Sequence, residues 1–360
     1  MWRRLLKDIH WPFIFSILGL AFVGTIFIHS AAYHDGGTYE TKQWFWFFMG
    51  IGAMFLVSMV GYRTFLSLAY VLYAVAMVSL IWVHIAGQTR LGAQRWLSLG
   101  PIAFQPSEFA KMATILALAN FLGSHYRWEK ENRIILAAVV LCVLPFLLIV
   151  KQPDLGSALL YVPMLVGMFF IWGIRYRYFI GACLAGLLGA PFFWGFLKGY
   201  QKERILVFLD PSRDPLGAGY TAIQSQIAVG SGGLFGKGYL AGTQSQLQFV
   251  PEHHTDFIFC VIGEEWGFLG AIVILVLYGL LFKTAFAILD HTTDMKAQLL
   301  ITGVIAVIFT QVFVNLGMTV GLMPITGITL PLVSYGGTSF IMTCVSLGLI
   351  SSIYQTRSIF

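Results

Sequence analysis

Five acidic side chains lie inside or beside long apolar segments, and they are the first candidates for chemistry in this chain. They are Glu108, Asp154, Asp256, Glu264 and Glu265. A carboxylate at membrane depth is costly, so such residues usually mark a functional site. The first three each stand at an end of an apolar segment, and on the topology derived below those ends face outward. Their convergence on one membrane face predicts a polar site there.

Glu108 belongs to Gln105–Lys111 (QPSEFAK), which has the features of a helix start. Pro106 suits the first helical turn, and a glutamate there complements the positive end of the helix dipole. Glu108 and Lys111 are at i, i+3 and therefore share a helix face. The pattern favours a polar cavity lined by this pair over a helix start with a merely local ion pair.

Asp154 lies in Lys151–Ser157 (KQPDLGS), a turn that opens another helix. An aspartate directly before a helix often caps its free backbone N–H groups. Capping alone and a role in the site are both compatible with this position.

Asp256 ends a long polar segment, in Pro251–Phe259 (PEHHTDFIF), where the chain enters an apolar helix. A half-desolvated carboxylate has a raised pKa, which suits a general base. The alternative is that Thr255 or Asp256 only caps the helix that follows.

The same stretch raises the question of a metal. Glu252, His253, His254 and Asp256 supply metal-ligating groups, but their spacing fits no closed structural zinc site. A loosely held Mg²⁺ or Mn²⁺ near Asp256 is the better metal hypothesis, and no cofactor is certain.

A glycine-rich segment, residues 230–242 (GSGGLFGKGYLAG), superficially suggests a phosphate loop. Ser231 stands where the first glycine of the Walker pattern belongs, and Gly238 follows Lys237 where that pattern has Ser or Thr. Nucleotide binding is therefore rejected. A flexible loop that approaches a lipid-linked substrate is still compatible with these residues.

Cations and a broken segment complete the candidates on the outward face. Arg95 and Lys111 could hold a diphosphate, although a solvated Arg95 is equally compatible with the residues. Residues 321–338 (GLMPITGITLPLVSYGGT) interrupt the path between two apolar segments. Irregular backbone at membrane depth is tolerated where it lines a cavity, which adds Thr326, Ser334 and Tyr335 to the expected lining.

Membrane helices must position these residues. The chain of 360 residues is 58% hydrophobic and only 11% charged, and its mean hydropathy is +0.79. A soluble domain carries about 25% charged residues, so a soluble enzyme is excluded. Despite a net charge of +6, nothing resembles a nucleic-acid-binding module. We expect an all-α polytopic membrane protein of about ten transmembrane helices, at 13–32, 44–61, 65–86, 106–124, 134–150, 157–173, 178–197, 258–283, 297–322 and 336–354.

The distribution of basic residues orients these helices. They concentrate in the segments that face the cytoplasm if the N-terminus is inside, which places both termini in the cytoplasm. Residues 198–257 then form one large extracytoplasmic loop between helices seven and eight. The loop is not of low complexity, so we expect it to be ordered and to hold short helices of its own.

These motifs together resemble the SEDS family (shape, elongation, division and sporulation) of bacterial cell-wall glycosyltransferases. The resemblance covers nearly the whole chain and is closer to the elongation branch than to the division branch. It rests on GAQRWL at 92–97, FQPSE at 104–108, QPDLG at 152–156, DPLGAGY at 214–220, GTQSQLQFVPEHHTDFIF at 242–259, NLGM at 315–318 and PLVSYGG at 331–337.

The resemblance implies a single membrane domain over residues 1–360 that polymerises peptidoglycan from lipid II at the outer face of the bacterial inner membrane. The family's essential aspartate falls on Asp256, its cavity Glu and Lys on Glu108 and Lys111, and its QPDLG aspartate on Asp154. The implied partners are lipid II, the growing glycan strand, membrane lipid and a class B penicillin-binding protein, which crosslinks the glycan.

A mechanism follows from combining these residues with that activity. Asp256 would be the base of an inverting transfer, while Lys111 and Arg95 stabilise the diphosphate leaving group. Glu108 and Asp154 would orient Lys111 and the sugar, with Ser334 in the cavity lining.

Three rival functions use the same outward face: a transporter or flippase of a lipid-linked precursor, a non-catalytic scaffold, and a lipid-linked-sugar ligase. The acids cluster on the outward half of the membrane, whereas a transporter needs polar groups through its full thickness. This placement favours an enzyme.

Overall fold

The structure is a computed structural model that describes residues 10–33, 38–90, 93–99, 102–126, 131–215 and 217–357. The described chain is mostly helical, and eight of its helical segments are long and apolar enough to cross a membrane. They are α2 (Trp11–Ala31), α3 (Thr38–Val60), α5 (Ala69–Ala86), α7 (Glu131–Lys151), α8 with α9 (Leu155–Leu159 and Tyr161–Trp172), α15 (Gly267–Asp290), α16 (Met295–Thr319) and α17 (Gly337–Arg357). The predicted class, a polytopic helical membrane protein, is confirmed.

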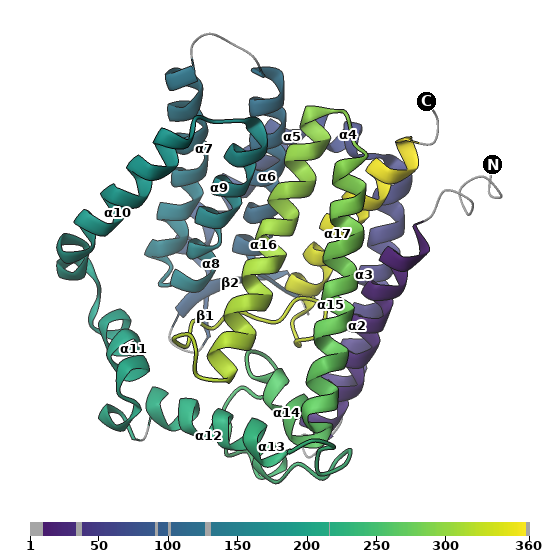
Figure 1. Ribbon diagram of the computed structural model, residues 1–360, viewed down its shortest axis with the longest axis vertical. Helices are drawn as coiled ribbons and strands as arrows, with labels where there is room; N and C mark the ends of the chain where they lie inside the picture. Colours follow the sequence, from purple (N-terminus) through teal and green to yellow (C-terminus); the bar gives the residue numbers. More distant parts are fainter. Residues whose placement is uncertain are drawn as a thin grey trace.

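The other two predicted apolar segments are helical as well, although they are not among these eight. α6 (Pro106–Ser124) carries Glu108 and Lys111 in its first two turns and is buried along most of its length. α10 (Tyr176–Phe196) contains Pro191 and lies at the periphery of the bundle (Figure 1). Each of the ten predicted segments therefore corresponds to a helix or a helix pair.

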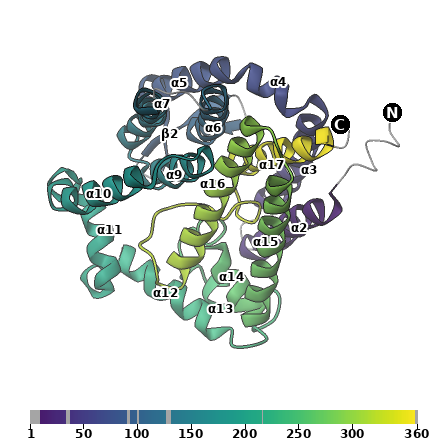
Figure 2. The ribbon, with the colours of Figure 1, turned by 45° about the horizontal axis from the view of Figure 1, so that its top comes forward.

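The membrane core is organised around α16. α16 packs against α6 and α9, α17 against α3, and α15 against α2. In Figures 1 and 2, α16 runs through the middle of the bundle, with α5, α6, α7 and α9 on one side and α2, α3, α15 and α17 on the other. The short helix α4 (Tyr62–Ser67) links α3 to α5.

The large loop folds as predicted, with helices of its own. It contains α11 (Gly199–Leu209), the 3-10 turn η2 (Pro211–Arg213), α12 (Ala218–Ser231) and α13 (Thr243–Gln246). These elements lie side by side along one end of the bundle (Figure 1). The chain then enters α14 (Ile258–Glu265), a short buried helix that breaks at Trp266 before α15 begins. The predicted single segment 258–283 is thus two helices.

A small antiparallel sheet was not predicted. β1 (Gln88–Arg90), β2 (Ala93–Leu99) and β3 (Ile102–Phe104) pair in that order between α5 and α6. The strands are too short to leave a clear alternating pattern in the sequence. The sheet carries Arg95 toward α6 and the 152–154 turn.

Candidate active site

A cavity of about 490 Å³ lies where Glu108, Asp154 and Asp256 meet, and all three acids line it. The three acids come from α6, from the turn before α8 and from the turn before α14, so separate elements converge there as predicted. The remaining wall is built by side chains of α3, β2, α8, α16 and the 327–339 segment. Its lining residues include Tyr39, Lys42, Trp46, Arg95, Trp96, Gln105, Ser157, Glu252, Thr255, Gln311, Thr329, Tyr335 and Ser339.

Asp256 is not a helix cap. α14 has Phe257 at its N-cap position, and no side chain there accepts a backbone hydrogen bond. The capping alternative for Asp256 is therefore wrong. Its carboxylate is partly buried and faces the cavity.

The electrostatic surroundings of Asp256 favour its protonated form. Burial, followed by the nearby Glu252 carboxylate, raises the pKa of Asp256 to about 7, against the opposing pull of Arg204 and Arg95. A carboxylate poised near neutral pH can accept a proton under physiological conditions.

The backbone of Asp256 is held from α16. Asn315 Nδ2 lies 2.8 Å from the Asp256 carbonyl oxygen and 2.7 Å from that of Ile328, so one buried amide group joins the two segments. Gly327 has a positive φ of 74°, and a Cβ there would lie 3.5 Å from Asp256 Oδ2. The carboxylate is thus placed against the 327–328 backbone.

Arg95 and Asp154 form the cationic side of the cavity. Arg95 Nη1 is 3.6 Å from Asp154 Oδ1, and the guanidinium also donates to the carbonyl oxygens of Gln152 and Pro153. Asp154 Oδ1 accepts from the Ser157 N–H at 3.2 Å, which caps α8. Asp154 therefore caps a helix and lines the cavity, so its two interpretations are compatible.

Glu108 and Lys111 form the ion pair that their spacing predicted. Lys111 Nζ lies 2.7 Å from Glu108 Oε1, and both residues are buried. Glu108 lines the cavity, whereas Lys111 lies behind it in a smaller pocket between α6, α16 and α17. Asp154 is paired with Arg95 instead. Its predicted role in orienting Lys111 is therefore not supported by a contact between the two side chains.

Ser334 lies outside the cavity lining. Its hydroxyl is buried and accepts the Leu330 N–H at 2.8 Å, which closes a turn in the broken segment. The prediction that Ser334 lines the cavity is wrong, because its hydroxyl is hydrogen-bonded to the backbone of its own segment. Tyr335 does line the cavity, and Thr326 does not.

Two cations at this site were missed. Lys42 lines the cavity and stands beside the start of the predicted helix 44–61, so the criterion that selected Glu108 would have found it had it been applied to bases. Arg204 lies in the large loop and was not among the predicted site residues, yet α11 carries it close to the acids. Burial, followed by repulsion from Arg95, lowers the pKa of Arg204, while Asp256 and Asp154 attract it.

The histidines do not converge with Asp256. His253 places Nδ1 3.0 Å from the Val250 carbonyl oxygen and Nε2 2.8 Å from that of Ala31. His254 packs against Tyr39 instead. Within the described ranges, no three His, Cys, Asp or Glu side chains form a metal-binding group. Asp256 and Glu252 both line the cavity and lie close enough for their charges to interact, so this pair of carboxylates could hold a divalent ion.

Fold and site together define a multi-pass helical membrane protein with an acid- and arginine-lined cavity at one face. The family model described as cell cycle protein, FtsW/RodA/SpoVE, matches residues 10–359, and the chain belongs to this family.

Curated relatives extend along almost the whole chain. It is 40% identical to peptidoglycan glycosyltransferase MrdB of Escherichia coli, over 95% of this chain and 92% of that protein. It is 33% identical to peptidoglycan glycosyltransferase RodA of Treponema pallidum, over 97% and 98%.

Solved structures show the same fold. A chain from a peptidoglycan synthase complex, described as coordinating polymerization and crosslinking, superimposes with a TM-score of 0.84 at 34% identity, covering 97% of this chain and 98% of that one. RodA of Thermus thermophilus superimposes with a TM-score of 0.73 at 30% identity, covering 97% of each chain.

Proposed function

We propose that this protein is a peptidoglycan glycosyltransferase that polymerises glycan strands from lipid II and supports cell elongation and shape. Relatives named MrdB and RodA, similar over nearly their full length, support this activity. The single observation that carries the mechanism is Asp256, a carboxylate facing the cavity with a pKa of about 7.

Asp256 is the general base of an inverting transfer. It takes the proton from the sugar 4-hydroxyl of one lipid II as that oxygen attacks the anomeric carbon of the growing strand. The bond from the anomeric carbon to the lipid diphosphate breaks, and the diphosphate leaves with the electron pair. Inversion needs one base and a good leaving group, not the paired carboxylates of a retaining glycosidase.

The cations around the cavity stabilise the leaving diphosphate. Arg95 and Arg204 can present guanidinium groups, which match phosphate oxygens bidentately. Lys111 lies behind Glu108 in the neighbouring pocket, where its charge is paired with the Glu108 carboxylate. Negative charge that develops on the leaving group is most stabilised by such preorganised partners.

A divalent cation is compatible with this site. Mg²⁺ is commonly held by one or two carboxylates plus substrate phosphate oxygens and water, and Asp256 and Glu252 would supply the carboxylates. Such an ion would neutralise the diphosphate. The steps assigned to Asp256, Arg95 and Arg204 do not require it.

The membrane placement and partner complete the proposal. Residues 1–360 act as one membrane domain of the bacterial inner membrane, with both termini in the cytoplasm and the 198–257 loop outside. Basic residues on the cytoplasmic side of this topology support that orientation. The transpeptidase partner is a class B penicillin-binding protein, a proposal supported by the similarity to a chain of a peptidoglycan synthase complex.

The test is polymerisation of purified lipid II by the purified chain with its cognate transpeptidase, comparing wild type with Asp256→Asn. Asn keeps the size of the side chain but cannot act as a base. Loss of a general base lowers the rate by roughly 10²–10⁴-fold. Ser334→Ala, at a buried hydroxyl outside the cavity, is the matched control and should retain polymerisation.

Two results would contradict this proposal. If Asp256→Asn polymerises like wild type, Asp256 is not the base. If wild type makes no glycan beside an active partner, the transporter and scaffold functions replace it. Titration with Mg²⁺ and Mn²⁺ separates the base role from a metal-ligand role.

A further inference from the structure

The glycine-rich turn 232–238, between α12 and α13, covers the break between α14 and α15. It accepts the first free N–H groups of α15: Phe268 N lies 2.9 Å from the Gly233 oxygen, and Leu269 N lies 3.2 Å from the Leu234 oxygen. α15 has no side-chain cap of its own. A broken helix near a membrane needs such internal partners, because lipid offers none.

The same turn also satisfies the end of α14. Lys237 N and Gly238 N each lie 3.0 Å from the backbone oxygens of Glu264 and Glu265. Glycine is required for this contact, since a Cβ at Gly236 would approach the Glu265 oxygen to 2.0 Å. The glycines therefore serve backbone packing against a helix break, and no phosphate is needed to explain them.

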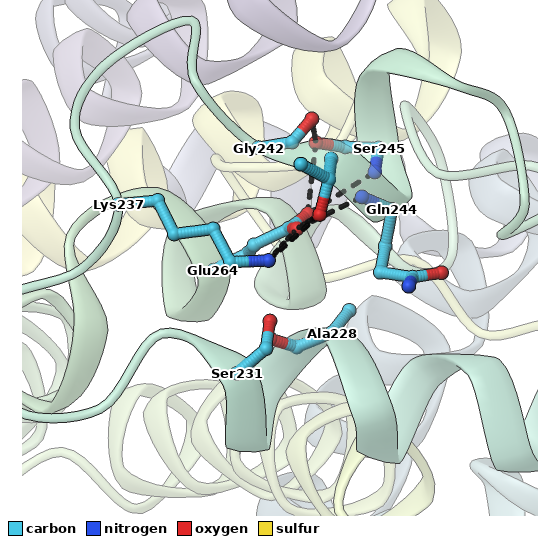
Figure 3. Close-up of polar contacts among 8 residues, drawn as sticks. Ala228, Ser231, Lys237, Gly242, Gln244, Ser245 and Glu264 are labelled. Atoms are coloured by element: carbon cyan, nitrogen blue, oxygen red, sulfur yellow. Dashed lines mark hydrogen bonds and ion pairs between the residues drawn. The ribbon is translucent and has the colours of Figure 1, made fainter.

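A buried carboxylate fastens the turn to α13 and α14. Figure 3 shows Lys237 reaching toward Glu264, with the start of α13 on the other side of the carboxylate. Glu264 Oε1 lies 2.7 Å from Lys237 Nζ and 2.8 Å from Gln244 N, and Oε2 lies 3.1 Å from Ser245 N. The position of the turn is thus fixed relative to the membrane helices.

Two large apolar side chains project from this fixed turn. Leu234 is 64% exposed and Phe235 is 78% exposed. Their neighbours on α15, Phe268 and Leu269, are also exposed and begin a candidate membrane span. The apolar surface of the turn is continuous with that of α15, because backbone hydrogen bonds join the two segments.

Tyr239, just after the turn, indicates the depth of the exposed Leu234 and Phe235 surface relative to the membrane. Its hydroxyl lies 3.1 Å from the Ile26 oxygen and 2.8 Å from His29 Nδ1, near the outward end of the span α2. Tyr239 as a whole is 42% exposed. Tyrosine with a polar tip and an exposed ring is typical of the membrane–water interface.

We infer that the turn 232–238 is an interfacial anchor whose Leu234 and Phe235 side chains insert into the outer leaflet of the bilayer. Amphipathic segments bind in this way through buried apolar area at the headgroup boundary. The partner of this surface is membrane lipid. The inference is independent of the proposed enzymatic role.

The test measures lipid contact in the full-length chain in nanodiscs. Cys183, the exposed cysteine, is changed to serine, while the other three are buried. Leu234→Cys and Phe235→Cys are made one at a time on this background and labelled with an environment-sensitive fluorophore. Nitroxide-bearing lipids then report depth. Arg213→Cys, in an exposed ion pair of the same loop, is the matched control.

Labels at 234 and 235 should be quenched several-fold more strongly than the label at 213, with shallow nitroxides acting best. Each variant must first unfold at the wild-type temperature. Equal quenching at all three positions overturns the inference. Labels that escape lipid quenching but become shielded from aqueous iodide when the transpeptidase is added also overturn it, since the turn would then be a partner surface.

Discussion

Asp256 and Glu264 are neighbouring carboxylates on the same stretch of chain, yet the structure places them in opposite chemical environments. Glu264 is fully buried and accepts five hydrogen bonds, from Lys237, Thr243, Gln244 and two groups of Ser245. Burial opposes ionisation of Glu264, but these donors outweigh it and hold its pKa below the ordinary value. Asp256, partly buried beside Glu252, has its pKa raised to about 7.

The contrast shows that donors, not burial alone, separate a structural carboxylate from a reactive one. A carboxylate surrounded by N–H and O–H groups is stabilised as an anion and has little tendency to take a proton. A carboxylate that has no such donors and lies near another acid keeps its proton up to about neutral pH.

The largest effect concerns pH. Asp256 must be deprotonated to act as a base, and its native pKa of about 7 lies above its ordinary value of 3.8. Polymerisation should therefore rise with pH up to about 7 and fall roughly tenfold per unit below it. The measurement is the initial rate of lipid II polymerisation from pH 5 to 8. A rate that is flat across this window would remove Asp256 from the role of base.

Glu264→Gln should reduce stability and spare the chemistry. Gln keeps the shape but places an NH₂ group against donors, so buried hydrogen bonds are lost at a cost of about 1–3 kcal/mol. Thermal unfolding in detergent measures the loss, and the folded fraction should keep its rate per molecule. Asp256→Asn is the opposite control: it should unfold at the wild-type temperature or above, because the native site disfavours the charged form of that aspartate.

Lys237→Ala should have the smallest effect. Glu264 retains four of its five donors, and the lysine side chain is 28% exposed, so solvent can replace part of the interaction. The expected loss is about 0.5–1.5 kcal/mol, well below that of Glu264→Gln. Thermal unfolding of the two variants side by side checks the order. A larger loss from Lys237→Ala would mean that the ion pair, rather than the backbone donors, holds the carboxylate.

Sequence reasoning found both carboxylates but could not distinguish them. Each lies at or in an apolar segment. This position shows that burying the carboxylate is energetically costly, but it does not show whether the residue is structural or reactive. The donors to Glu264 come from residues 243–245, and only the folded return of α13 onto α14 brings them there. By contrast, Glu108, Asp154 and Asp256 could be placed on one face, because each marks a helix end and alternating passes through the membrane fix which ends share a face.

The membrane helices were predictable because twenty apolar residues have few other stable arrangements. The short strands β1–β3 were not, since pairing of three to seven residues depends on neighbours and leaves little pattern. Arg204 was missed for a related reason: α11 carries it back close enough to Asp256 and Asp154 for their charges to interact, and nothing local in the sequence marks that return. Ser334 was misplaced because a serine in a broken segment can serve the backbone as readily as a ligand.

The shared amide of Asn315 has a consequence for how such chains can be altered. Because it holds the Asp256 and Ile328 carbonyl oxygens together, the end of the 198–257 loop and the segment before α17 form one mechanical unit. Residues of both segments that lie away from the Asn315 contacts can be inserted, deleted or substituted while these contacts are kept. A chimera that imports the 198–257 loop from a relative must therefore bring the matching 320–336 segment with it.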